Sequence, residues 1–253
     1  MKKHVLVLAI AAAMLAACGK KEEPVVAAPE PAPVAAAPAA LPPAAPEAAP
    51  AIEHPLDAPP ADAAPGPEPL PALADADTLV SDRLAELLGR ANALRFLQLD
   101  GFARRAVATV DNLGRSHAPV MVWPVQPTPG RFASVKAADG GTETIHPDNS
   151  ARYAPLVTLL ESVDSAQAVA LYRGLYPLFQ QAYEELGFPG RYFNDRLVRV
   201  MDLLIATPVP ATPPALQLVD VKGEVPSTRP WVRYEYADPA LESLSAGQKI
   251  LLR

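Results

Sequence analysis

Apolar side chains in residues 73–253 recur mostly three and four positions apart, the spacing that places them on one face of a helix. In residues 75–88 the apolar run ends at Gly89, a common helix-ending residue. The same spacing predicts six helical stretches: 75–88, 93–114, 149–163, 165–187, 194–208 and 239–253. The second should break near Asp100–Gly101, and Pro177 should kink the fourth. The expected N-caps are Asp75 or Asp77, Asp164 or Ser165, and Asn194.

Short stretches elsewhere alternate between apolar and polar residues, which is the pattern of a half-buried strand. Residues 132–136 and 142–144 flank the turn 138–141 and predict a hairpin, and a second strand pair is expected at 215–222 and 231–236. Val120–Trp123 lies in a proline-rich stretch, so we expect an edge strand or an extended loop there. The pattern predicts an α+β, predominantly helical fold: a single compact domain of about six helices with one or two small antiparallel ribbons.

The residues before this domain carry a different composition. Sixteen of the 31 prolines lie between Pro24 and Pro71, in a stretch that is otherwise dominated by alanine. Such a segment has few large apolar side chains, so it cannot offset the entropy lost on ordering. We therefore expect residues 24–72 to be a disordered linker and residues 73–253 to be the globular domain.

The N-terminus has the layout of a secretory signal, with two lysines, an apolar run of 11 residues and then small residues. One interpretation is an ordinary signal peptide in which Cys18, the single cysteine of the chain, is incidental. The alternative is that Leu15–Cys18 resembles a bacterial lipobox, so that residues 1–17 are a lipoprotein signal peptide and 18–23 the lipidated N-terminus. We favour lipidation of Cys18, because an unused thiol in an exported chain invites mispairing.

This interpretation makes the membrane a partner of the chain through its lipid anchor. Gly19 follows the cysteine where an Asp would retain enteric lipoproteins in the inner membrane. By that resemblance, we expect the protein to be anchored in the outer membrane, facing the periplasm.

Charge and motif content exclude several functions. Residues 73–253 hold 20 acidic and 18 basic residues, so the domain lacks the basic field that attracts nucleic acid. The chain contains no serine-hydrolase elbow, zincin, P-loop or dinucleotide-binding motif, and we expect no catalytic residue, cofactor or metal site. The domain's two histidines, His117 and His146, lie far apart in loop-like sequence.

Aromatic residues form one stripe on the predicted helix 165–187. Its members, separated by four, three and four positions, are Tyr172, Tyr176, Phe179 and Tyr183. The stripe has two possible roles. It is either part of the core, as buried aromatics usually are, or a platform for a sugar or peptide in a groove opened by Pro177.

Polar residues gather next to this stripe, at the start of the predicted helix 194–208. One interpretation is structural: a helix cap at Asn194, with surface pairs of Arg199 to Asp195 and Asp202. The other is a site for an anion or carboxylate, held by arginines and free backbone N–H groups. The candidate ligand or partner site comprises Tyr176, Tyr183, Arg191, Tyr192, Asn194, Asp195, Arg196 and Arg199.

Four segments, residues 107–113, 176–198, 203–210 and 234–253, resemble an uncharacterised family of bacterial envelope proteins, the domain-of-unknown-function family numbered three thousand and fourteen. The resemblance implies no activity, cofactor or functional residue. We therefore expect a cell-envelope lipoprotein that presents a non-catalytic interaction domain to an envelope protein or cell-wall partner. The alternative is an envelope-acting enzyme, or a small-ligand or glycan binder, that uses an aromatic–arginine groove.

Overall fold

The computed structural model describes residues 51–56, 70–136, 140–220 and 228–253. The predicted signal peptide, Cys18 and the predicted lipidated N-terminus lie outside the described residues, as does most of the predicted linker. The linker residues 51–56 are described, and they contact the domain.

Helices dominate the described residues, which confirms the predicted fold class. The helices are α1 (Asp77–Leu88), α2 (Arg90–Phe96), α3 (Phe102–Leu113), α4 (Asp148–Ala151), α5 (Ala154–Glu161), α6 (Ser165–Glu185), α7 (Phe193–Ile205), α8 (Pro239–Glu242) and α9 (Ala246–Leu252). These nine arise from the six expected stretches because three of the stretches divide in two. The short loop between α2 and α3 ends at Gly101, which has a left-handed backbone with φ of 60°.

The four strands form one antiparallel sheet in the order β1-β2-β3-β4. They are β1 (Ser134–Lys136), β2 (Glu143–Ile145), β3 (Ala215–Leu218) and β4 (Tyr234–Tyr236). Both predicted strand pairs are therefore present. Pairing of Thr144 with Ala215 joins them into a single sheet.

Three local expectations are corrected. Val120–Val122 is a turn of 3-10 helix, because its backbone bonds close locally: the Trp123 N–H donates to the Val120 carbonyl at 3.3 Å. Ala76 is the N-cap of α1, without a side-chain cap. The Asp77 carboxylate instead accepts the Gly101 N–H at 3.0 Å, which ties α1 to the start of α3. The third correction, at Asn194, belongs to the site below.

The main hydrophobic core lies between α1, α3, α6 and the first turn of α7. Its buried members include Val80 and Leu84 of α1, Val107 of α3, and Leu175 and Leu178 of α6. Helix α6 runs unbroken from Ser165 to Glu185 through Pro177, and the expected Asp164 cap is present.

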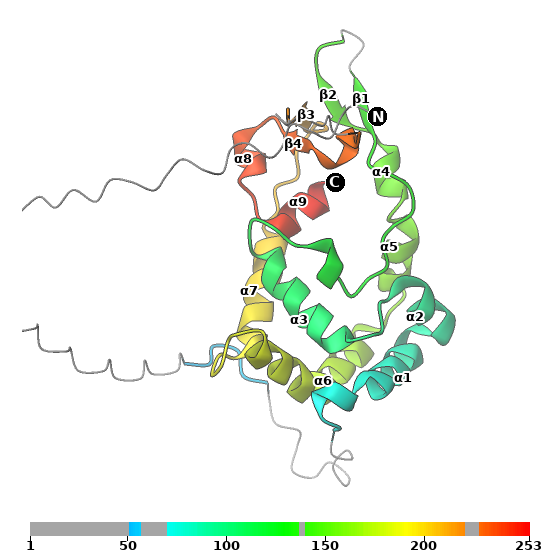
Figure 1. Cartoon of the computed structure of the whole chain (residues 1–253), viewed down its shortest axis with the longest axis vertical. Coiled ribbons are helices and arrows are strands. Elements are labelled where there is room, and N and C mark those ends of the chain that lie inside the picture. Colours follow the sequence, from blue (N-terminus) through cyan, green and yellow to red (C-terminus); the bar gives the residue numbers. More distant parts are fainter. Residues whose placement is uncertain (1–50, 57–69, 137–139, 221–227) are drawn as a thin grey trace, which may run out of the picture. The chain divides into compact units, whose positions relative to one another are not determined.

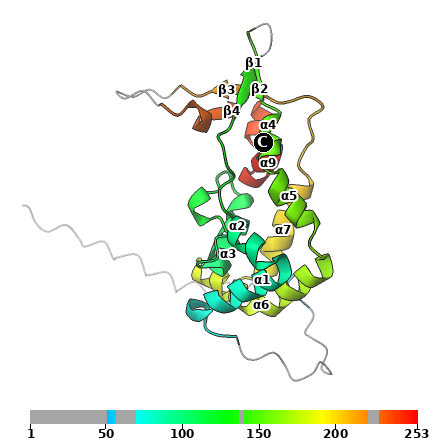
Figure 2. The ribbon, with the colours of Figure 1, turned by 90° about the vertical axis from the view of Figure 1, so that its right-hand side faces the viewer.

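Figure 1 shows α1, α2, α3 and α6 gathered at one end of the domain and the sheet at the other, and the turned view in Figure 2 agrees. Helix α7 and the α4–α5 pair run between these two ends. Within the described ranges, no helix combines the length and apolar character that a membrane crossing requires.

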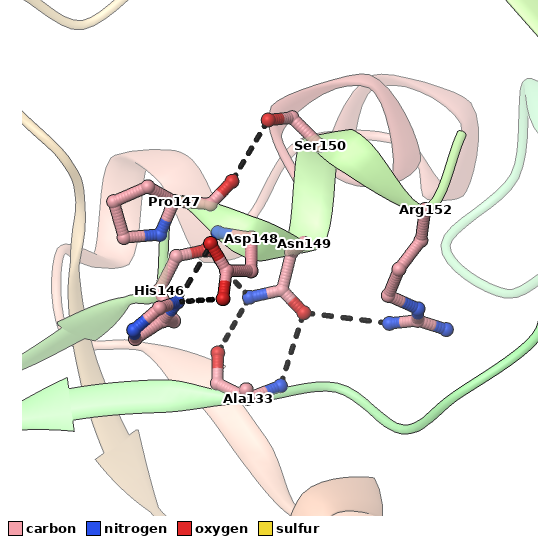
Figure 3. A network of polar contacts seen from close by, with 7 residues as sticks. All are labelled: Ala133, His146, Pro147, Asp148, Asn149, Ser150 and Arg152. Atoms are coloured by element: carbon pink, nitrogen blue, oxygen red, sulfur yellow. Dashed lines mark hydrogen bonds and ion pairs between the residues drawn. The ribbon is translucent and has the colours of Figure 1, made fainter. Parts of the chain in front are cut away.

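Helix α4 is fixed to the strand hairpin by Asn149, which is buried (Figure 3). Its amide donates to the carbonyls of Ala133 and His146, at 2.5 and 2.8 Å, and its oxygen accepts the Ala133 N–H at 3.0 Å. These bonds use both amide hydrogens and the oxygen, so Asn149 is a structural link between α4 and the hairpin.

Candidate functional site

The site begins with the way α6 supports the first turn of α7. The Phe193 N–H donates to Gln180 Oε1 at 2.9 Å, and the Asn194 N–H donates to the Tyr176 hydroxyl at 3.3 Å. Two N–H groups that usually remain free at a helix start are thereby occupied. The anion-site interpretation required free N–H groups here, and these two are not available to an anion.

Asn194 is not the cap of α7, which corrects the expectation from sequence. The N-cap is Tyr192, whose extended backbone precedes the first helical residue and whose side chain makes no cap hydrogen bond. Asn194 lies within the first turn, so its side chain projects from the helix and is free to contact another segment.

The aromatic stripe contributes both to the core and to this site. Phe179 and Tyr183 are 8% and 4% exposed, and Tyr183 packs against Phe193 with ring centroids 5.4 Å apart. Tyr172 and Tyr176 are only partly buried. Phe179 and Tyr183 therefore belong to the core, whereas Tyr172 and Tyr176 bring hydroxyl groups to the start of α7.

Tyr172 orients the Asn194 side chain. Its hydroxyl donates to Asn194 Oδ1 at 2.9 Å, which leaves the Asn194 amide hydrogens to point elsewhere. Burial, and secondarily the nearby Tyr192, raise the pKa of Tyr172 above its ordinary value of 10.0. A tyrosine hydroxyl is already protonated at neutral pH, and the raised pKa keeps that of Tyr172 a donor at more alkaline pH as well.

The linker residues 51–56 bind across this first turn. The Glu53 N–H donates to both carboxylate oxygens of Asp195, at 3.2 and 3.1 Å, and the His54 N–H donates to Oδ1 at 2.7 Å. The Asn194 amide donates to the His54 carbonyl at 2.8 Å. The Leu56 N–H donates to the Tyr192 hydroxyl at 3.1 Å.

One side-chain contact accompanies these main-chain bonds. Arg199 Nη2 and Nε lie 2.9 and 3.3 Å from the two carboxylate oxygens of Glu53. The hydrogen bond to Glu53, followed by the charge of that residue, raises the pKa of Arg199. Tyr192, Asn194, Asp195 and Arg199 together are called the α7 peptide site below.

The remaining candidate residues have other roles. Arg196 Nε donates to Asp111 Oδ1 at 3.0 Å, which joins α7 to α3, and the carboxylate of Asp111 is also paired with Arg115. Arg191 is exposed and offers its carbonyl to Gln180. Arg199 forms its ion pair, among the described residues, with Glu53 and not with the expected partners within α7.

Sequence reasoning missed three participants: Gln180, the orienting role of Tyr172 and the linker residues 51–56. No local motif marks the linker residues, because they bind mostly through backbone groups that every residue except proline possesses. The described residues contain no group of three or more His, Cys, Asp or Glu side chains placed to hold a metal ion.

A separate open pocket of about 840 Å³ lies between α1 and α6, and charged residues such as Asp82, Arg83 and Glu86 line it together with leucines. Its lining includes Leu70, Leu79, Leu87 and Leu171. None of the four residues of the α7 peptide site lines it.

Comparison with known proteins adds the family and no activity. Residues 102–253, from the first turn of α3 onward, match the family model described as a protein of unknown function, DUF3014. No curated protein and no solved structure matches the chain. The match covers more than half of the chain and includes every residue of the α7 peptide site, in agreement with the resemblance found in the sequence. The chain therefore belongs to the DUF3014 family.

Proposed function

We propose that the protein is a cell-envelope lipoprotein, anchored through Cys18, that presents a non-catalytic interaction domain. The observation that carries the interaction role is the use of Asn194 and Asp195, both buried in a helix start, to hold the main chain of an extended segment. Peptide-recognition domains work in this way, with main-chain bonds supplying affinity and a few side-chain contacts supplying selectivity.

The anchor and the location rest on the N-terminal sequence. The signal-like residues 1–17 precede a single cysteine, and three acyl chains on that cysteine would hold the protein permanently on a membrane. Gly19 favours the outer membrane over the inner membrane.

Replacement of Cys18 by Ala tests the anchor. The unmodified chain should incorporate a labelled fatty acid and sediment with outer membranes of the bacterial cell. The Cys18→Ala variant should incorporate no label and should not sediment with membranes. A variant that stays membrane-bound would contradict the proposed anchor.

The interaction role has its own test in cells. A photo-crosslinking amino acid at Arg191, which is exposed next to the α7 peptide site, should join the lipidated chain to one stoichiometric envelope partner. The same substitution at Arg83, exposed on α1, is the control position and should not give that product. Absence of any partner at Arg191 would contradict an interaction role for this face.

A further inference from the structure

We infer that the α7 peptide site recognises extended peptides in which an acidic residue stands two positions before a proline, and that residues 53–56 are an exchangeable ligand bound in cis. This inference rests on the proposed interaction function and names its ligand. The sequence Glu53-His54-Pro55-Leu56 shows what the site accepts.

The main-chain contacts define the peptide's register. The site accepts N–H groups from the acidic residue and from the residue after it, donates to the carbonyl of that second residue, and accepts the N–H of the fourth. Pro55 occupies the third position, where none of these bonds needs an N–H. Proline also restricts the preceding residue to an extended backbone, so this sequence is pre-shaped for the site.

One side-chain contact adds selectivity. Arg199 receives the Glu53 carboxylate through two nitrogen–oxygen contacts, a paired geometry that suits a planar carboxylate. The side chain of His54 is exposed, so the residue between the acid and the proline is unrestricted. The ligand class is therefore acidic residue, any residue with an N–H, proline, any residue with an N–H.

The site needs an occupant of this kind. Asp195 is only 7% exposed, and a buried carboxylate requires donors. The N–H groups of Glu53 and His54 are its donors in the structure. Any extended main chain in the same register supplies the same two donors.

The present occupant is attached in a way that permits exchange. Residues 51–55 are exposed, and Ile52, the largest apolar side chain among them, is 54% exposed. Apart from Leu56, which is half-buried, the segment therefore buries little apolar surface, the dominant source of durable association. The site also lies within the family-matched region, residues 102–253, whereas residues 51–56 lie outside it.

A peptide-binding titration on the full chain tests the inference. The probe is a fluorescent peptide with the sequence of residues 51–56, AIEHPL, and the readout is fluorescence anisotropy. The cis segment is disabled by His54→Pro, which removes the N–H that lies 2.7 Å from Asp195. Because a tethered competitor acts at an effective concentration near millimolar, the His54→Pro chain should bind the probe about 10-fold or more tightly than the unmodified chain.

Matched controls separate the main chain from the side chains. His54→Ala removes the same side chain but keeps the N–H, and should bind the probe as weakly as the unmodified chain does. In the His54→Pro background, Asp195→Asn should abolish binding, whereas Asp202→Asn, the same change at an exposed position of α7, should not. Asp195→Asn could also disturb the helix start, so the probe itself is varied: AIEPPL should fail to bind and AIQHPL should bind several-fold more weakly.

Three results would overturn the inference: equal affinities for the unmodified and His54→Pro chains, no binding by the His54→Pro chain, or equal binding of AIEPPL and AIEHPL. Failure of this inference can be distinguished from failure of the proposed function. A failed titration leaves membrane attachment and crosslinking at Arg191 unaffected. A failed fatty-acid labelling of Cys18 leaves the peptide affinity unaffected.

Discussion

The two ends of helix α7 are both covered by segments distant in sequence, but the attachments differ in kind. At the C-terminal end, α9 packs so closely that a Cβ on Gly247 would lie 2.6 Å from Leu204 Cδ2 and 3.0 Å from the Leu113 carbonyl oxygen. At the N-terminal end, residues 51–55 remain exposed and bind through their main chain. The comparison separates a permanent structural contact from one that can be replaced.

Polar groups reinforce the difference. Gln248 is buried in α9, donates to the Leu203 carbonyl of α7 at 3.0 Å, and completes a capping box with Ser245. Its partners lie at fixed positions of the fold. At the other end, the hydrogen bonds that the Asp195 carboxylate makes within the described part of the chain come from the backbone N–H groups of Glu53 and His54, which a second peptide can supply equally well.

The largest expected effect comes from filling the close contact of α9. Gly247→Ala should lower the free energy of unfolding by up to about 2 kcal/mol, because overpacking costs about 1–3 kcal/mol and the gain in helix propensity returns about 1 kcal/mol. Urea unfolding followed by circular dichroism measures the change. Peptide binding to the His54→Pro chain should be unaltered by this substitution, since α9 contacts the opposite end of α7.

Gly174→Ala is the matched control. Gly174 lies within α6, is exposed, and a Cβ there would have no neighbour within 4 Å. The same substitution should therefore stabilise the domain by about 0.5–1 kcal/mol. Equal effects at both glycines would show that α9 is not tightly packed, and would remove the contrast between the two ends of α7.

Local patterning predicted the elements at both ends of α7, but it predicted neither partner. Helical spacing predicts the stretch 194–208, and the polar residues at its start are the basis of the candidate site. Asn194 was assigned to a cap because that role is local. Its actual partner, the His54 carbonyl, lies 140 positions away, where no sequence period reaches.

Residues 51–56 could not be distinguished from the rest of the linker by composition. Their binding depends on N–H and C=O groups, and composition describes side chains. The break in the predicted helix 239–253, which separates α8 from α9, can be predicted from the sequence. Ser245 and Gln248 have the spacing of a capping box, a signal for a new helix start that marks the beginning of α9.

A change of intermediate size in the free energy of unfolding is expected from lowering the pH, because acid should weaken the contacts of α9 with α8. Glu242 accepts from Lys249 Nζ at 2.7 Å and from the Tyr236 N–H at 2.9 Å, linking α8 to α9 and β4. Burial alone would raise the pKa of Glu242, but these hydrogen bonds outweigh it and hold the pKa below its ordinary 4.5. A lowered folded-state pKa stabilises the fold above pH 4.5, and this contribution is lost as the pH falls through the folded-state value.

Comparison of the unmodified chain with Glu242→Gln measures that contribution. The difference between their free energies of unfolding should be constant near neutral pH and should shrink below about pH 4.5. Glu86→Gln, which alters an exposed pair with Arg83, is the control and should differ little from the unmodified chain at any pH. A Glu242→Gln difference that does not change between pH 7 and 3 would exclude a stabilising role for the ionised carboxylate.

The smallest expected effect is at the N-terminal end. Glu53→Ala should change the free energy of unfolding by no more than about 1 kcal/mol, because both Glu53 and Arg199 keep 53% of their side-chain surface exposed and exposed ion pairs contribute little. In a double-mutant cycle with Arg199→Ala, the coupling energy should be equally small and should vanish at about 1 M salt, where charges are screened beyond about 3 Å. A coupling above about 2 kcal/mol would make the linker a permanent part of the fold. A small effect is what exchange requires, because a cis segment held by weak contacts can be displaced while the domain stays folded.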